Sequence, residues 1–361
     1  MKQRLDTLDI CKGIAMILVT IGHILGSIPT PPPRGIVAVM HICYAVELPI
    51  FFMACGIQLQ YNDTTEKTAK SFFCSRLKRI MWPYLTFSIF YLLIDASIVV
   101  IKYAVKKVIS WDVLVAGIFE SIFLWGRGAL WFLPVFFEVS VLFYLINKYL
   151  YSLNHLLSIS IMLIGNLFAG KMEAYYPLFL ENCATIKQYV AVSIIRTMVA
   201  YSYVYIGALL MPLIKRAATE KRSLRKAATG LFFVILGCIG AQLTPEILDL
   251  HFGYTRNPFV TYPTAIILFI GLFMLVDGYK VECLVKISNN SMFLMGMQFL
   301  TGYIVKVTLI VWGYFNIVMN SYCVGIVTSI LFIATIIPCT YIQKKYVPFM
   351  IKPPIKQKGE L

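Results

Sequence analysis

Long apolar stretches recur along the whole chain of 361 residues. Stretches of about 17–25 apolar residues are long enough to cross the ~30 Å hydrocarbon core of a bilayer as helices. A membrane β-barrel would instead show alternating apolar and polar positions in segments of about ten residues, and the sequence lacks that pattern. The sequence therefore predicts an all-α, polytopic helical bundle of about ten transmembrane helices, at residues 8–28, 36–60, 80–102, 130–148, 154–170, 189–214, 228–244, 258–278, 290–313 and 321–342.

One further apolar stretch, residues 113–126, is too short to cross the bilayer comfortably and contains Glu120. We predict a re-entrant or interfacial element there. No linker, low-complexity region or internal repeat interrupts the chain. Residues 1–361 are therefore predicted to form a single membrane-embedded domain.

The composition agrees with a membrane protein. The chain is 59% hydrophobic and 14% charged, and its mean hydropathy is +0.78. Soluble domains are about 45–50% apolar and about 25% charged. The predicted location is the plasma (inner) membrane, with the lipid bilayer as the surrounding partner.

The distribution of basic residues predicts the orientation. Most Lys and Arg residues between the spans fall on the side of the N-terminus, so both termini are predicted to be cytoplasmic. This bias also accounts for most of the net charge of +15. No nucleic-acid-binding motif is present, and no nucleic-acid partner is predicted.

Cysteine usage gives no metal or disulfide signal. The chain has nine cysteines, but it has no C-x-x-C pair and only Cys183 falls in a predicted outer loop. A single cysteine outside cannot build a disulfide framework. No metal site is predicted.

Two ionisable residues lie inside the first predicted span. Lys12 and His23 are eleven residues apart. At about 100° and 1.5 Å per residue, they share one helix face about 16 Å apart along the axis. Ionisable groups in a membrane span are costly and indicate a functional site. The alternative for His23 is a simple hydrogen bond to a neighbouring helix.

The second span adds two candidate catalytic residues. His41 is predicted at a depth similar to that of His23, and Glu47 lies deeper, beside Pro49. Proline can kink a helix and open it to water. The side chains of His23, His41 and Glu47 could therefore meet in one cavity. As with His23, the alternative for His41 is a hydrogen bond to a neighbouring helix.

Arg76 and Arg79 precede the third span on its cytoplasmic side. Residues three apart share a helix face, and the guanidinium fork binds phosphates well. Coenzyme A carries three phosphates, so the pair is a candidate donor site. The alternative is that both arginines only anchor the helix at the membrane surface.

Four motifs, in order and at similar spacing, resemble the acyltransferase family three of membrane proteins. The first is Arg or Lys, ten residues, then His, present here as Lys12 and His23. The others are R-L-x-R-x-x-x-P-Y at 76–84, G-x-L-W-F-L at 128–133, and P-L-F-F-x-x-S-G, which reads P-I-F-F-M-A-C-G at 49–56. The resemblance runs from about residue 6 to residue 300 and is closest to the fucose O-acetylase-like branch.

The resemblance implies an O-acyltransferase that modifies a polysaccharide or other glycan. Acetyl-CoA would be the cytoplasmic acyl donor, and the acceptor would be a hydroxyl of a cell-surface or lipid-linked saccharide. A hydroxyl needs proton removal to attack a thioester, and histidine is suited to that task. His23 would be the general base, while Lys12, Arg76 and Arg79 would bind coenzyme A.

The acceptor site is expected in the outer half of the bundle. Trp125, Arg127 and Trp131 surround a G-R-G turn and could stack on a sugar, and Arg196 could contact a polar or anionic group. The alternative is that these aromatic residues belong to the membrane interface, where Trp and Tyr are enriched.

The sequence departs from the family pattern at three positions. Glu47-Leu48-Pro49 stands where relatives often have H-M-P, and Gln298 replaces a late histidine. The acidic residue that follows the tryptophan motif is Glu138, two positions later than in the branch with the longer motif. These departures put a second catalytic base in doubt but leave His23 untouched.

Two other classes of protein remain open at this point. A transporter or flippase of lipid-linked saccharide would use intramembrane charges such as Asp95, Arg196 and Lys306. An inactive relative that only scaffolds a glycan-assembly complex is the third possibility.

Overall fold

The computed structural model describes residues 6–26, 34–106, 111–172, 185–220, 222–243, 249–253, 257–298, 338, 341–342 and 345–353. Within these ranges the regular elements are helices and there is no β-strand, which confirms the all-α class. The helices are α1 Asp6–Gly26, α2 Arg34–Tyr61, α3 Ala69–Arg76, α4 Trp82–Lys106, α5 Asp112–Ile122, α6 Phe132–Tyr149, α7 Asn154–Met172, α9 Ile186–Thr219, α10 Leu224–Gln242, α11 Pro258–Val276 and α12 Glu282–Asn289.

Seven helical segments of the described chain are long and apolar enough to cross a membrane: Arg34–Tyr61, Ala69–Val100, Gly128–Tyr149, Tyr151–Met172, Ile186–Thr219, Leu224–Gln242 and Pro258–Val276. Each overlaps a predicted span. The predicted span 8–28 corresponds to α1. Most of spans 290–313 and 321–342 lies outside the described residues, so the number of ten and the cytoplasmic termini stay predictions.

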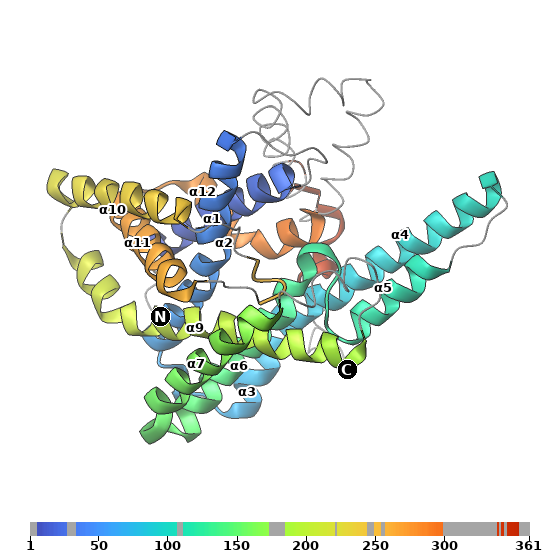
Figure 1. Cartoon of the computed structure of the whole chain (residues 1–361), viewed down its shortest axis with the longest axis horizontal. Helices are drawn as coiled ribbons and strands as arrows, with labels where there is room; N and C mark the ends of the chain where they lie inside the picture. Colours follow the sequence, from blue (N-terminus) through green and yellow to red (C-terminus); the bar gives the residue numbers. More distant parts are fainter. Residues whose placement is uncertain are drawn as a thin grey trace, which may run out of the picture.

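The helices surround a central group formed by α1, α2 and α9 (Figure 1). Helices α10 and α11 pack against each other on one side of this group, and α7 and α6 pack against α9. On the opposite side, α4 and α5 form an antiparallel arm that extends from the bundle (Figure 1). The middle of α2 is buried from Ala45 to Glu47 and again from Pro49 to Ile57, which is typical of a helix enclosed on all sides.

Helices α2 and α9 touch through their backbones. A Cβ atom on Gly56 would overlap the Val204 carbonyl oxygen, and one on Gly207 would overlap the Met53 carbonyl oxygen. Small residues allow this approach, and in a membrane such close packing replaces the hydrophobic effect as the force between helices. The two glycines therefore fix how α2 and α9 cross.

A buried ion pair ties α10 to α11 and α1. Lys226 donates to Asp277 at 2.6 Å, and Thr7 donates to the other oxygen of the same carboxylate at 2.8 Å. Both charged side chains are almost fully enclosed, with exposed fractions of 6% and 9%. Mutual pairing compensates for their removal from water.

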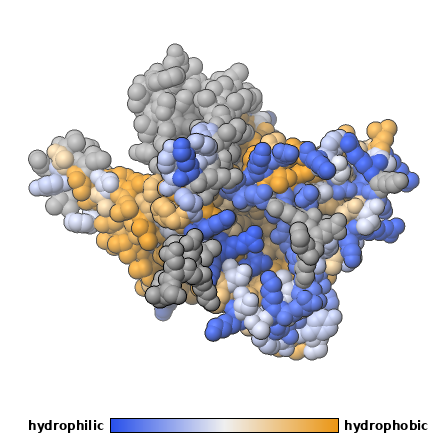
Figure 2. Space-filling view, turned by 180° about the vertical axis from the view of Figure 1, so that it is seen from behind, coloured by the Kyte–Doolittle hydropathy of each residue, from blue (hydrophilic) through white to orange (hydrophobic). Residues whose placement is uncertain are grey.

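The arm of α4 and α5 presents apolar side chains to its surroundings. Leu93 and Val100 of α4, and Val115 and Ile122 of α5, are each at least 60% exposed. Figure 2 shows the corresponding hydrophobic surface along the arm. At 11 residues, α5 is too short to span a bilayer. The re-entrant or interfacial placement of residues 113–126 stays a prediction.

Substitution of Gly207 tests the crossing of α2 and α9. We expect Gly207→Ala to lower the stability of the detergent-solubilised protein by about 1–3 kcal/mol, because the added methyl group has no space. The measurement is the thermal unfolding midpoint.

Gly170→Ala is the matched control, since a Cβ on Gly170 of α7 would meet no atom within 4 Å. This change should be neutral or stabilising by up to about 1 kcal/mol, because alanine is the better helix former. An unfolding midpoint of Gly207→Ala equal to that of the control would contradict the backbone contact.

Candidate functional site

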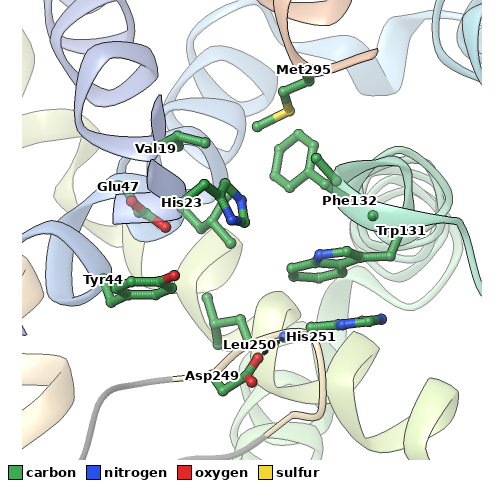
Figure 3. Close-up of a pocket in the computed structure, with 13 residues that line it drawn as sticks. Val19, His23, Tyr44, Glu47, Trp131, Phe132, Asp249, Leu250, His251 and Met295 are labelled. Carbon is green, nitrogen blue, oxygen red and sulfur yellow. Dashed lines mark hydrogen bonds between the residues drawn. The ribbon is translucent and has the colours of Figure 1, made fainter. Parts of the chain in front are cut away.

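A cavity of about 220 Å³ lies between α1, α2, the start of α6 and the short segment 249–253. Figure 3 shows its lining side chains converging from these separate parts of the chain. The lining residues are Val19, His23, Tyr44, Glu47, Leu48, Gly128, Ala129, Trp131, Phe132, Asp249, Leu250, His251 and Met295.

His23 lies in the last turn of α1 and faces this cavity. Its side chain is exposed, in contrast to the buried residues at Val19, Thr20 and Gly22. The ring of Tyr44 on α2 meets the imidazole edge-on, with centroids 6.4 Å apart. The structure therefore leaves the His23 imidazole accessible inside an otherwise buried region.

Glu47 brings a carboxyl group into the same cavity. Its side chain is 2% exposed, and its Oε2 atom has no hydrogen-bond partner among the described residues. A Cβ atom on Gly22 would come within 3.0 Å of Oε2, so this glycine leaves room for the carboxyl group. An enclosed carboxyl oxygen without a partner is costly and indicates a place for a ligand.

His41 does not line the cavity. Its Nδ1 atom contacts the carbonyl oxygen of Ala241 on α10 at 3.3 Å. This is the hydrogen bond to a neighbouring helix that the sequence left open as the alternative. The predicted catalytic role of His41 draws no support from this position.

An aromatic wall closes the side of the cavity opposite α1. Trp131 lines the cavity, and the His251 ring stacks on it with centroids 5.1 Å apart and an angle of 18° between the planes. Trp125 lies behind, with its centroid 5.1 Å from that of His251. The wall therefore combines a helical turn, η3 Gly128–Trp131, with the segment between α10 and α11.

Arg196 of α9 supports this wall from behind. Its guanidinium lies 4.6 Å from the Trp125 ring and 5.8 Å from the Trp131 ring. It donates to the carbonyl oxygens of Leu124 at 3.0 Å and Trp125 at 3.3 Å. With 2% of its surface exposed and no place in the cavity lining, Arg196 holds the tryptophan turn in place.

Arg127 also makes an internal contact. It forms an ion pair with Asp95 of α4, whose carboxylate is 3% exposed. Of the four predicted acceptor residues, only Trp131 lines the cavity. Trp125, Arg127 and Arg196 surround that residue and connect it to α9 and to the arm.

Asp249 and His251 also line the cavity, although neither was predicted as a site residue from the sequence. The backbone N–H of His251 donates to the Asp249 carboxylate at 3.0 Å, which orients both residues at the cavity. Burial raises the pKa of Asp249 from 3.8 to about 6. Burial, together with the charges of Arg196 and His23, holds the pKa of His251 well below its usual range. The sequence feature that could have indicated this part of the site is an acid and a histidine two positions apart in the loop between two predicted spans.

The basic residues predicted to bind the donor lie apart from the cavity. Lys12 pairs with Asp9 at 2.7 Å on α1. Arg76 is half-buried, with its guanidinium 5.2 Å from the Phe72 ring, whereas Arg79 is exposed. A π-helical turn, η2 Leu77–Met81, begins directly after Arg76.

Two departures from the family pattern have structural roles. Gln298 is buried and donates to the Val19 carbonyl oxygen at 3.1 Å, one turn before His23 on α1. Glu138 accepts a hydrogen bond from Thr197 at 2.6 Å, which joins α6 to α9. Neither residue lines the cavity.

A family model described as an acyltransferase domain, that of membrane acyltransferase family 3, matches residues 5–340. Since the match covers nearly the whole chain, the protein belongs to this family of membrane acyltransferases. No curated protein and no solved structure gives a significant match. The fucose O-acetylase-like branch stays a prediction.

Substitution of Arg196 tests two roles against each other. The sequence predicts that Arg196 binds the acceptor, whereas in the structure it supports the tryptophan turn. We expect Arg196→Ala to lower the stability of the protein by about 2–4 kcal/mol, because two carbonyl groups lose charged hydrogen bonds. Thermal unfolding measures this loss.

Arg216→Ala, which removes an arginine that is 81% exposed on the same helix, should leave the midpoint unchanged. If Arg196→Ala instead kept full stability and only raised the KM for the acceptor, Arg196 would be a binding residue after all.

Proposed function

We propose that this membrane acyltransferase moves an acetyl group from cytoplasmic acetyl-CoA to a hydroxyl of a cell-surface or lipid-linked glycan. The observation that carries the proposal is the cavity where the accessible imidazole of His23 meets the enclosed carboxyl group of Glu47. In a chain that belongs to an acyltransferase family, this pair has the parts that hydroxyl acylation needs.

In the proposed reaction, His23 acts as the general base. An acceptor hydroxyl loses its proton to the imidazole as its oxygen forms a bond to the thioester carbon. The carbon–sulfur bond then breaks, and the coenzyme A thiolate leaves with the proton that His23 releases. A positioned base of this kind contributes about 10²–10⁴-fold in rate.

Glu47 would stabilise the imidazolium that forms on His23 during this step. A carboxylate acts more strongly in an enclosed site than in water, because the effective dielectric constant is lower. It is also held in place before the reaction begins, so it does not need to reorganise. Gly22 supports this role, since its missing side chain leaves room for the carboxyl group.

The donor would bind at the basic end of the bundle. Arg79 is exposed and Arg76 half-buried, so both guanidiniums can reach phosphates of coenzyme A. Lys12 lies deeper and would contact the pantetheine arm, while Asp9 holds its ammonium group in position. About 16 Å of helix between Lys12 and His23 is comparable to the length of that arm.

The transporter alternative finds little support in the described residues. Asp95 is paired with Arg127, and Arg196 is bound to backbone carbonyl groups. Lys306 lies outside the described residues. Two of the three charges invoked to line a transport pathway, Asp95 and Arg196, thus hold the fold together.

Removal of the proposed base is the direct test. We expect His23→Gln and His23→Ala to lower the turnover of acetyl-CoA by about 10²–10⁴-fold, because no general base then takes the proton of the attacking hydroxyl. The assay follows labelled acetyl transfer by protein reconstituted in vesicles, at equal amounts of folded protein.

His155→Gln is the matched control, because His155 of α7 is bound to the Tyr205 hydroxyl at 2.8 Å and does not line the cavity. Wild-type rates in both His23 variants would remove His23 from the mechanism. A comparable loss in His41→Gln would support the catalytic role predicted for that residue.

The donor site is tested by Arg76→Ala combined with Arg79→Ala. We expect the apparent KM for acetyl-CoA to rise about tenfold with little change in kcat, because phosphate contacts contribute uniform binding. Steady-state kinetics on inverted vesicles measure both constants.

The control pair is Arg216→Ala with Arg225→Ala, which removes two exposed arginines predicted to lie on the same side. If the apparent KM for acetyl-CoA were the same in both double variants, Arg76 and Arg79 would only anchor the helix at the membrane surface.

A further inference from the structure

We propose that the acceptor is a sugar without a negative charge, and that Asp249 selects it by excluding carboxylate-bearing sugars. This inference rests on the proposed function and specifies the substrate class of the same cavity. Three features of the described residues carry it: the charge of the lining, the unpartnered Glu47 oxygen and the aromatic wall.

The cavity lining is acidic. Glu47 enters from α2, and Asp249 enters from the segment between α10 and α11. Among the described residues that line the cavity there is no Lys or Arg. The nearest buried arginine, Arg196, lies behind the tryptophan rings with its terminal nitrogens on backbone carbonyl groups. A carboxylate inside the cavity would therefore meet two acids without a compensating cation.

The carboxyl groups of the cavity can accept hydrogen bonds from a ligand. Glu47 Oε2 is enclosed and has no partner among the described residues, and Figure 3 shows this carboxyl group turned toward His23. Asp249 is fixed by the backbone N–H of His251, which leaves its carboxylate as a rigid acceptor at the cavity. Sugar hydroxyls are donors that satisfy such oxygens, whereas a sugar carboxylate has no proton to give at neutral pH.

The shape of the cavity fits one sugar ring. Its volume of about 220 Å³ is below the range of about 300–1,000 Å³ typical of pockets for drug-sized ligands. The indole of Trp131, backed by the stacked ring of His251, provides a flat wall for the apolar face of a pyranose. One hydroxyl of a ring in this place would face His23, and its other hydroxyls would face Glu47 or Asp249.

An acidic acceptor site also keeps the two substrates apart. Coenzyme A is strongly anionic, and its proposed phosphate contacts are at the basic end, on Arg76 and Arg79. Like charges within one low-dielectric space repel. The acids of the cavity would thus disfavour entry of the coenzyme A phosphates while admitting the uncharged acyl–pantetheine end.

The test compares matched acceptor pairs on reconstituted protein with acetyl-CoA. The pairs are methyl glucuronamide with methyl glucuronide and methyl galacturonamide with methyl galacturonide. Both members of each pair lack the C6 hydroxyl, and they differ only in whether C6 carries a neutral amide or a carboxylate. We expect at least about tenfold faster acetylation of the neutral member, because a carboxylate there is both repelled and unsatisfied.

Asp249→Asn should narrow this ratio to about threefold or less, mainly by raising the rate on the uronides. Asparagine keeps an oxygen that can accept the His251 N–H, so the segment should retain its shape. Asp249→Glu should preserve the discrimination. Glu282→Gln, which removes an exposed carboxylate with a side chain that is 85% exposed, should leave the ratio at the wild-type value.

The pH dependence provides a second measurement. With a pKa of about 6, Asp249 is charged at pH 7.5 and largely neutral at pH 5. The wild-type preference for neutral sugars should therefore shrink as the pH falls through 6, and it should change less in Asp249→Asn. Among the described residues that line the cavity with Asp249, the other titratable groups are Glu47 and Tyr44 from α2, His23 from α1 and His251 from its own segment. Because these groups remain in the variant, the difference between the two profiles reports Asp249.

The outcomes separate the two proposals. Equal or faster acetylation of uronides, or a preference unchanged in Asp249→Asn at pH 7.5, would overturn the inference while the proposed function stands. The inference would also be overturned if the protein acetylated uronides or other anionic acceptors but no neutral sugar. A protein that neither binds nor consumes acetyl-CoA would instead refute the proposed function itself.

Discussion

The backbone contact between α2 and α9 is the constraint on which the rest of the site depends. Gly56 and Gly207 let the two helices approach until main-chain atoms touch. From this crossing, Glu47 is nine residues away along α2, or about 13.5 Å, and Arg196 is eleven residues away along α9, or about 16.5 Å. One helix thus delivers a carboxyl group to the cavity, and the other delivers the cation that supports the opposite wall.

The ionisable side chains separate into three groups with different surroundings. Lys12, Arg76 and Arg79 lie outside the cavity lining, and the acids Glu47 and Asp249 belong to it. A third set, which includes Arg127, Arg196 and Lys226, is occupied by ion pairs or backbone carbonyl groups. Buried charges of this third kind stabilise the fold only when paired, so their presence in a span does not by itself indicate substrate contact.

Much of the architecture could be predicted from the sequence. Long apolar runs determine where helices cross a membrane, and each of the seven qualifying segments overlaps a predicted span. Depth alone paired His23 with His41, but His41 contacts the Ala241 carbonyl oxygen. Glu47, which was predicted deeper on α2, lines the cavity with His23 instead. The family motifs indicated the same class of protein that the family model now shows.

The remaining features depend on contacts that periodicity does not encode. Arg127 was predicted to be available for a sugar because its partner, Asp95, lies on α4, is separated from it by α5 and is distant in sequence. Likewise, Arg196 looked like a ligand-binding charge because the carbonyl groups it satisfies belong to an irregular turn. Asp249 and His251 were not predicted as site residues, because a short loop has no repeating pattern that indicates which way its side chains point.

The placement of Asp249 on a loop has a consequence for how such a chain can change over evolutionary time. The proposed base, His23, belongs to a helix held by tight packing, where Gly13 leaves no space for a side chain against the Leu284 backbone. Segment 249–253 lies between helices and carries a separate wall of the same cavity. Substitutions or insertions in connecting segments are better tolerated than changes in packed helices. Relatives could therefore acquire new acceptors through substitutions of a few loop residues, while the helices that carry His23 and Glu47 stay unchanged.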